Sequence, residues 1–189
     1  MADPSIRCFI AIPLPPQIRQ DLKRVQAFLK DCKIHGSWPS PDRFHLTLAF
    51  LGNIPLTRVN TVKKAMLDAA LENPGFELTI NRLGVFPGLN KARVIWAGLH
   101  RKSPELHGLY HNLYTKLKAE DLFSTQQRFI PHITLTRIKK NLRREKLKPI
   151  LEEDLFVNPA PFHVKYMDLY ESRLTRSGAV HTRIYRADL

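Results

Sequence analysis

The chain has 189 residues, of which 43% are hydrophobic and 25% are charged, and its formal net charge is +13. This length and balance favour one globular domain, residues 1–189, and no apolar run is long enough to span a bilayer, which argues against a membrane protein. The excess of 30 Lys and Arg over 17 Asp and Glu indicates a polyanionic partner, with simple solubility as the alternative.

Strands and helices are predicted to alternate along the chain. In the first half, apolar runs predict strands at 6–12, 43–50, 76–80 and 92–99, and helical spacing predicts helices at 16–30 and from Val59 to the stop at Asn73-Pro74-Gly75. In the second half we expect a helix capped by Ser103, a strand at 129–136, and a closing hairpin of strands 162–171 and 180–187. Because a turn joins the last two strands, the class is α+β with mainly antiparallel sheets.

The basic excess is concentrated in residues 137–148, named here the basic run, which hold seven basic residues and one acid. The run is either a short helix ending before Pro149 or an exposed loop. A solvated surface tract is the bland interpretation, because charge runs are commonly just that. The alternative is contact with an RNA backbone, for which four residues are candidates: Lys139, Lys140, Arg143 and Arg144.

The pattern H-x-T-x occurs twice, as His45-Leu46-Thr47-Leu48 and His132-Ile133-Thr134-Leu135. Side chains alternate between the two faces of a strand, so each His shares a face with its Thr while the aliphatic pair enters a core. One copy is weak evidence, but two copies half a chain apart are much more specific. They suggest two duplicated lobes whose motif strands face each other across a cleft.

Two imidazoles on opposite sides of a phosphorus atom are suited to phosphodiester chemistry. A reference pKa near 6.5 lets one ring be neutral and the other protonated close to neutral pH, as a base and an acid require. Thr47 and Thr134 would donate hydroxyl hydrogen bonds to the non-bridging phosphate oxygens. This scheme needs no metal and no cofactor. His107 and His111 are spaced for a metal on one helix, but no H-E-x-x-H accompanies them, so surface or packing roles are favoured.

The chain resembles the 2H phosphoesterases, and within them the RNA 2′,3′-cyclic phosphodiesterases, also called 2′-5′ RNA ligases or LigT-like proteins. The resemblance is carried by four segments in the family's order: 7–15, 38–52, 94–99 and 128–137. It implies two pseudo-symmetric lobes of mainly antiparallel sheet, with helices on the outside, flanking a central cleft. It also implies RNA with 2′,3′-cyclic phosphate ends as the substrate, tRNA halves among them.

The resemblance also implies roles that the sequence alone does not order. His45 is then the proton donor to the departing 3′ oxygen and His132 the acceptor that activates water, leaving an RNA 2′-phosphate. Arg137 fits the family's arginine after the second motif as a phosphate-binding residue. Strand parity, however, puts Arg137 opposite His132, so this role requires the strand to end by then. Phe44 and Phe129 are candidates for stacking on an RNA base, with core packing as the alternative.

Four interpretations of the function remain open at this point, of which the weakest is a small-molecule cyclic nucleotide phosphodiesterase, because the basic charge counts against it. The first is hydrolysis of RNA 2′,3′-cyclic ends, and the second is ligation of tRNA halves that bear 2′,3′-cyclic phosphate and 5′-hydroxyl ends. The third is a non-catalytic RNA-binding module. Because we identify no signal peptide, no membrane span and no disulfide spacing at Cys8 and Cys32, we expect a cytoplasmic protein. We also expect a monomer with no obligate protein partner. A cleft position for His181 is also open.

Overall fold

The computed structural model describes residues 4–99, 103–123, 129–140, 142–156, 159–175 and 178–189. Within these ranges the chain forms two four-stranded sheets, a two-stranded ladder and four α-helices, and every strand pairing is antiparallel. The predicted α+β class with two mainly antiparallel lobes is therefore confirmed. None of the described helices is long and apolar enough to cross a membrane.

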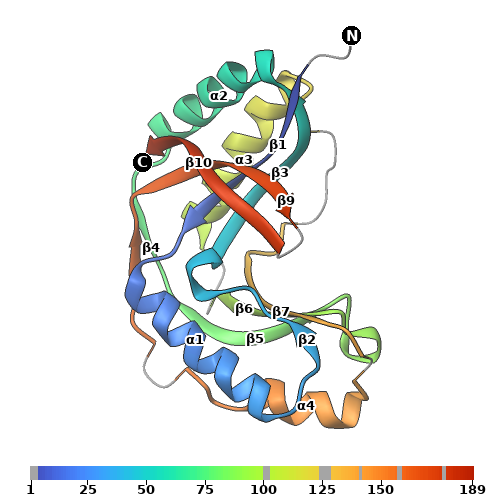
Figure 1. Cartoon of the computed structure of the whole chain (residues 1–189). Helices are drawn as coiled ribbons and strands as arrows, with labels where there is room; N and C mark the ends of the chain where they lie inside the picture. The colour runs from blue at the N-terminus through green and yellow to red at the C-terminus, as the bar shows by residue number, and fades with distance from the viewer. Residues whose placement is uncertain (1–3, 100–102, 124–128, 141, 157–158, 176–177) are drawn as a thin grey trace.

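The first lobe is a sheet in the order β10-β9-β1-β3. Its strands are β1 (Ser5–Pro13), β3 (His45–Pro55), β9 (Tyr166–Thr175) and β10 (Gly178–Asp188). Two helices, α2 (Val59–Leu71) and α3 (Pro104–Ala119), pack against each other, and α2 also contacts β9 and β10. These helices lie at the same end of the molecule as this sheet (Figure 1).

The second lobe is a sheet in the order β2-β7-β6-β5. Its strands are β2 (Gly36–Ser37), β5 (Ile80–Phe86), β6 (Val94–Leu99) and β7 (His132–Ile138). Its helices are α1 (Pro16–Asp31), which contacts β7, and α4 (Arg144–Glu152), which contacts β5, and both lie at the opposite end from α2 and α3 (Figure 1). The remaining elements are the ladder of β4 (Phe76–Leu78) with β8 (Phe162–Val164) and three short 3₁₀ turns, η1 (Pro41–Arg43), η2 (Leu56–Arg58) and η3 (Leu89–Lys91).

One apolar core runs through both lobes. α1 begins with Pro16 in its first turn, where the missing amide hydrogen costs nothing, and it buries Leu22 and Leu29 on one face. α3 begins as predicted, because the Ser103 hydroxyl accepts a hydrogen bond from the Leu106 amide at 3.2 Å. Contacts between β3 and β7 bring the two motif strands next to each other where the lobes meet.

Several predicted boundaries are wrong. The predicted strand 76–80 is divided between β4 and β5, which belong to different sheets, and β5 continues to Phe86. The strand predicted at 43–50 does not end at residue 50 but continues, as β3, to Pro55, because its pairing with β1 extends to that residue. α4 does not end before Pro149 but runs on to Glu152. Pro149 removes one backbone hydrogen bond from that helix, and the fully buried Leu147, two residues earlier, anchors it to the core.

Candidate active site

Both motif strands contain a β-bulge directly after the motif threonine. In β3, Thr47 pairs with Ala11 and Ala49 pairs with Ile10, so Leu48 is the extra residue. A bulge places two residues of one strand opposite one residue of its partner and changes which face the following side chains occupy. Accordingly, two consecutive residues of β3, Leu48 and Ala49, are both buried.

The second motif strand repeats this irregularity at the same place. Thr134 pairs with Trp96 and Thr136 pairs with Ile95, so Leu135 is extra, and both Leu135 and Thr136 are buried. The predicted parity of Arg137 is therefore wrong. β7 does not end before Arg137, as its role would have required, but the bulge turns the guanidinium to the face that carries the motif residues.

The two motifs line a single cavity of about 660 Å³. His45 and Thr47 enter it from β3, and His132 and Thr134 enter it from β7. Among the described residues that line the cavity, none is Asp or Glu, whereas three are arginines: Arg7, Arg43 and Arg137. A cavity with this lining favours an anionic ligand, because its described lining residues carry three guanidinium groups and no carboxylate.

Each motif histidine is held by the backbone two residues before it. The Nδ1 atom of His45 lies 2.7 Å from the Arg43 carbonyl oxygen, and that of His132 lies 2.8 Å from the Ile130 carbonyl oxygen. A carbonyl oxygen only accepts, so Nδ1–H must be the donor in both rings. The neutral rings then carry their lone pair on Nε2, the atom available for proton transfer.

The surroundings of the two imidazoles differ. The ring of His45 lies 4.9 Å from Phe9 and 5.8 Å from His181, measured between ring centroids. The ring of His132 lies edge-on to Phe86 at 4.9 Å and has Trp96 at 6.1 Å. Both catalytic candidates are thus packed against aromatic rings, which exclude water from one side of each imidazole.

Burial lowers the pKa of both imidazoles. For His45 the pKa falls to about 4, with the backbone hydrogen bond opposing the shift and the imidazoles of His181 and His132 adding to it. The pKa of His132 is also lowered by burial, and the Arg137 guanidinium adds to that effect. Both rings are therefore neutral at pH 7 before a ligand binds. An anion between them would favour their charged forms and raise both pKa values.

The two phenylalanines proposed for base stacking do not line the cavity. Phe44 is only 3% exposed and belongs to the core, which is the alternative that the sequence left open. Phe129 stacks face to face on Tyr110 of α3, with ring centroids 4.0 Å apart, and its edge neighbour is His107. The stacking prediction is therefore wrong for Phe44, which no base could reach, while Phe129 is engaged in packing on α3.

The basic run lies at the surface. Its four candidates, Lys139, Lys140, Arg143 and Arg144, are all exposed and lie outside the residues that line the cavity. Arg137 belongs to both the run and the cavity. A role for the other four would therefore involve an extended ligand that leaves the cavity.

Sequence reasoning missed Phe50 as a residue of the cavity. Phe50 follows the Leu48 bulge just as Arg137 follows the Leu135 bulge, and it is 62% exposed in the cavity wall. Alternation along β3 predicts a buried Phe50, and nothing in the sequence pattern marks the bulge. His181, for which the sequence left a cleft position open, also lines the cavity; its Nδ1 is buried without a hydrogen-bond partner among the described residues, and burial lowers the pKa of its imidazole.

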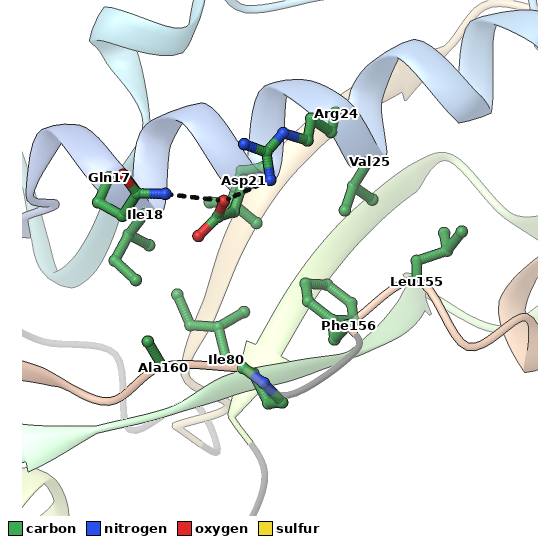
Figure 2. Close-up of a pocket in the computed structure, with 11 residues that line it drawn as sticks. Gln17, Ile18, Asp21, Arg24, Val25, Ile80, Leu155, Phe156 and Ala160 are labelled. Atoms are coloured by element: carbon green, nitrogen blue, oxygen red, sulfur yellow. Dashed lines mark hydrogen bonds and ion pairs between the residues drawn. The ribbon is translucent and has the colours of Figure 1, made fainter.

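Other chemistry finds little support in the described residues. Cys8 lines the cavity, but burial and the Glu171 carboxylate raise the pKa of its thiol to about 11, so it is protonated and a poor nucleophile. No group of three or more His, Cys, Asp or Glu side chains suited to a metal ion occurs among the described residues. A second cavity of about 390 Å³ lies between α1, β5 and the segment after α4 (Figure 2). In its wall, the Asp21 carboxylate accepts hydrogen bonds from Gln17 and Arg24.

Two antiparallel lobes that meet at a cavity holding both H-x-T-x motifs define the class of two-histidine phosphoesterases. A family model described as LigT like Phosphoesterase matches residues 12–96 and 102–181, so the chain belongs to the LigT-like phosphoesterase family. This confirms the resemblance seen in the sequence.

Known relatives match over most of their length. An RNA 2′,3′-cyclic phosphodiesterase of Methanothermobacter thermautotrophicus is 28% identical over 181 residues, which cover 94% of this chain and 96% of that protein. The Escherichia coli RNA 2′,3′-cyclic phosphodiesterase is 32% identical over 139 residues, covering 72% of this chain and 74% of that protein. The crystal structure of Escherichia coli LigT with 3′-AMP superposes with a TM-score of 0.77 at 26% identity, covering 98% of this chain and 99% of that one.

Proposed function

We propose that this phosphoesterase hydrolyses RNA 2′,3′-cyclic phosphate ends to 2′-phosphomonoesters, with His45 and His132 as acid and base. The observation that carries the proposal is the shared cavity, into which each lobe contributes one histidine and one threonine. The names of the relatives support the RNA substrate, and the arginines of the cavity support an anionic one. We further propose that residues 1–189 act as a single 2H phosphoesterase domain, because neither lobe alone holds both histidines.

In the proposed mechanism water attacks phosphorus while His132 Nε2 takes a proton from it. The bond from phosphorus to the 3′ oxygen breaks, and His45 Nε2–H gives its proton to that oxygen, so the phosphate stays on the 2′ oxygen. The assignment of donor and acceptor follows the family resemblance. The Nδ1 hydrogen bonds to Arg43 and Ile130 hold both rings in the tautomer that this transfer needs.

The proton on His45 is supplied by ligand binding in this scheme. The lowered pKa leaves the free ring neutral at pH 7, whereas a bound phosphodiester anion favours the imidazolium. Thr47 and Thr134 donate hydroxyl hydrogen bonds to the non-bridging oxygens, and Arg137 adds a positive charge where negative charge grows. The charge is stabilised by groups that the strands hold in place before the reaction begins.

Product analysis tests this function. An oligonucleotide with a 2′,3′-cyclic phosphate end is incubated with the protein, alone and with a second oligonucleotide bearing a 5′-hydroxyl. We expect a 2′-phosphate end from wild type, and the same product formed far more slowly by His45→Gln or His132→Gln, while His111→Gln, an exposed site on α3, retains activity. A 3′-phosphate product would contradict the assigned leaving group. A joined product would identify ligation as the activity, and binding without any product would identify an RNA-binding module.

A further inference from the structure

The tip of the hairpin of β9 and β10 extends beyond the sheet and forms one wall of the cavity. β1 pairs with β9 only from Asp168 to Glu171, so the residues of β9 after Glu171 pair with β10 alone. Five residues of this outer part of the hairpin line the cavity: Ser172, Leu174, Gly178, Ala179 and His181. The hairpin thus adds a wall to the cavity on the side of the first lobe, beside His45.

Positive charge from Arg43 meets this wall. The guanidinium reaches the first residue of β10, since a Cβ atom at Gly178 would lie 3.2 Å from Nη1 of Arg43. Its charge also acts on His181, whose pKa is lowered by burial and by Arg43. Arg43 forms no ion pair with a described residue, and the described lining of the cavity offers no carboxylate. The charge of Arg43 is therefore not compensated from within the cavity.

His181 adds a hydrogen-bond donor beside this charge. Its Nδ1 is buried and has no hydrogen-bond partner among the described residues. A hydrogen on Nδ1 would be a buried donor without an acceptor, which proteins avoid more strictly than an unpaired acceptor. The neutral ring therefore carries its hydrogen on Nε2. Because the ring is half-buried in the cavity wall and Nδ1 is covered, Nε2–H is the polar group that a ligand oxygen can reach.

We propose that Arg43 and His181 form a second phosphate subsite, which holds the phosphate on the 5′ side of the terminal nucleoside. This inference rests on the proposed function and extends its site. In the proposed mechanism the departing 3′ oxygen faces His45, so the ribose lies on the His45 side of the reacting phosphorus. The next anionic group along the RNA is the 5′ phosphate, one ribose away.

The chemistry of the two side chains fits that group. The His181 ring lies 5.8 Å from the His45 ring, measured between centroids, so the subsite begins next to the reacting phosphate. A guanidinium binds phosphate oxygens through charge-assisted hydrogen bonds, and the imidazole N–H supplies a further donor. Arg43 also holds His45 through its carbonyl oxygen, so one residue links the two phosphate positions.

The subsite predicts which cyclic phosphates are good substrates. The terminal nucleotide of an RNA chain carries a phosphodiester on its 5′ oxygen, whereas a nucleoside 2′,3′-cyclic phosphate carries a hydroxyl there. Only the first of these fills both phosphate positions. We therefore expect the protein to prefer RNA ends and 5′-phosphorylated cyclic nucleotides over cyclic nucleotides with a free 5′-hydroxyl, whatever the base.

Two adenosine ligands that differ only in the 5′ group isolate the subsite. Calorimetry measures the dissociation constants of adenosine 2′-monophosphate and adenosine 2′,5′-bisphosphate. Wild type should bind the bisphosphate roughly 10- to 150-fold more tightly, the contribution expected from a hydrogen bond to a charged group. Arg43→Gln should remove most of this preference, and Arg43→Lys should keep part of it because the charge remains. His181→Phe, which keeps a ring against Phe9, should reduce the preference by less than Arg43→Gln does.

The other two arginines of the cavity are the matched controls. Arg137→Gln removes a guanidinium proposed to act on the reacting phosphate, which both ligands share, so it should weaken both and leave the ratio of their dissociation constants nearly unchanged. Arg7→Gln removes the other guanidinium of the first lobe. A larger loss of preference from Arg7→Gln than from Arg43→Gln would overturn the proposed location.

The remaining outcomes also decide the proposal. Equal affinity of wild type for the two ligands, or an equal loss of preference in Arg43→Gln and Arg137→Gln, would overturn the subsite. If Arg43→Gln does not fold, an unchanged preference in His181→Phe would overturn it. Binding is measured separately from turnover. A wild-type protein that prefers the bisphosphate but forms no product from a cyclic-ended oligonucleotide would therefore contradict the proposed function and leave the subsite supported.

Discussion

The two motif strands, β3 and β7, have the same backbone geometry but different surroundings. Each carries a His and a Thr on the cavity face, a ring Nδ1 bonded to the carbonyl two residues earlier, and a bulge one residue after the Thr. Beyond the bulge, β3 presents Phe50 and β7 presents Arg137. The duplicated geometry positions two imidazoles, and the residue after the bulge makes the two sides of the cavity chemically different.

The two imidazoles also differ in the neighbouring groups that affect their protonation. His45 has two imidazoles as neighbours that lower its pKa, whereas His132 has the Arg137 guanidinium. Both shifts disfavour the charged ring in the free protein, and a ligand anion reverses both. Each ring therefore depends on a bound anion for its charge, and the acid and the base become distinct only in the complex.

The largest expected effect comes from removing either imidazole. His45→Gln and His132→Gln should each reduce kcat by about 10²- to 10⁴-fold, the usual contribution of a general acid or base. The double variant should lose less than the product of the two single losses, because the rings act as a unit. Single-turnover kinetics on a cyclic-ended oligonucleotide provide the measurement. A near-normal rate for either single variant would mean that the replaced histidine is neither the general acid nor the general base.

The threonines test whether the two lobes contact the phosphate equally. Thr47→Val and Thr134→Val keep the shape and remove the hydroxyl, so each should cost about 1.5–3 kcal/mol of transition-state stabilisation, as expected for one hydrogen bond to a charged group. The value comes from the ratio of kcat/KM between wild type and variant. Thr136→Val is a control, since that hydroxyl is buried and donates to the Ser37 carbonyl oxygen at 3.1 Å rather than entering the cavity. A large loss from one threonine alone would show that one lobe holds the phosphate.

Much of this architecture follows from local patterns that the sequence displays. The alternation of His and Thr with aliphatic residues predicts the cavity face of both strands, and the periodicity of Leu22 and Leu29 predicts α1. The bulges could not be predicted, because nothing in Leu48 or Leu135 distinguishes an extra residue from an ordinary core position. Their presence depends on the register with β1 and β6, which is a tertiary property.

The unpredicted bulges explain two errors in the candidate site, at Arg137 and at Phe50. Parity counted without a bulge put Arg137 on the wrong face and gave no reason to consider Phe50. Phe44 precedes His45 and therefore points into the core, as simple alternation required. His181 lies 49 residues after His132 and belongs to no recognisable motif. The pairing of β10 with β9 brings its ring beside that of His45.

The lowered pKa values predict that anion binding is linked to proton uptake. Sulfate keeps its charge over the accessible pH range, so any pH dependence of its affinity reports on the protein. Because His45 has a pKa of about 4 when free, and sulfate raises it, affinity should fall as pH rises above about 4, by up to tenfold per pH unit. The fall should level off above the pKa of the complex.

Calorimetry of sulfate binding across this range tests the linkage. His45→Gln should flatten the pH dependence, and the remaining slope should be assigned with His132→Gln and His181→Gln, since these imidazoles also lie in the cavity. The guanidinium groups of Arg7, Arg43 and Arg137 should give the variants a residual affinity for sulfate. A pH-independent affinity in wild type would mean that the rings do not become charged when an anion binds.

A smaller effect is expected at Gln26, which holds the bulge of β7. This side chain of α1 is only 3% exposed, and its amide nitrogen donates to the Pro39 carbonyl at 2.9 Å and to the Leu135 carbonyl at 3.0 Å. Leu135 is the extra residue that turns Arg137 into the cavity. Gln26→Leu keeps the volume, leaves both carbonyls without this donor, and should lower kcat several-fold through a misplaced Arg137.

The coupling between the two residues distinguishes positioning from simple destabilisation. If Gln26 acts through Arg137, the double variant Gln26→Leu/Arg137→Gln should be no slower than Arg137→Gln alone. Thermal denaturation gives the loss of stability separately from the kinetics. Losses in kcat that multiply in the double variant would mean that Gln26 serves the fold and not the position of the guanidinium.

The smallest effect on the chemical step is expected from the basic run, which lies on one lobe only. If it follows the RNA backbone, affinity for long oligonucleotides should fall steeply with salt, with a slope near −0.7 per phosphate contact on single strands. Replacing Lys139, Lys140, Arg143 and Arg144 with Gln should flatten that slope and raise KM for long RNA. A cyclic nucleotide that fills only the cavity should respond far less. The control replaces Lys64 and Lys118, two exposed lysines at the α2 and α3 end of the molecule (Figure 1), and should change the slope less per charge removed. Equal salt slopes in both variants would mean that the basic run is a solvated surface tract without RNA contact. Equal losses of activity on long and minimal substrates would mean that the run belongs to the catalytic site.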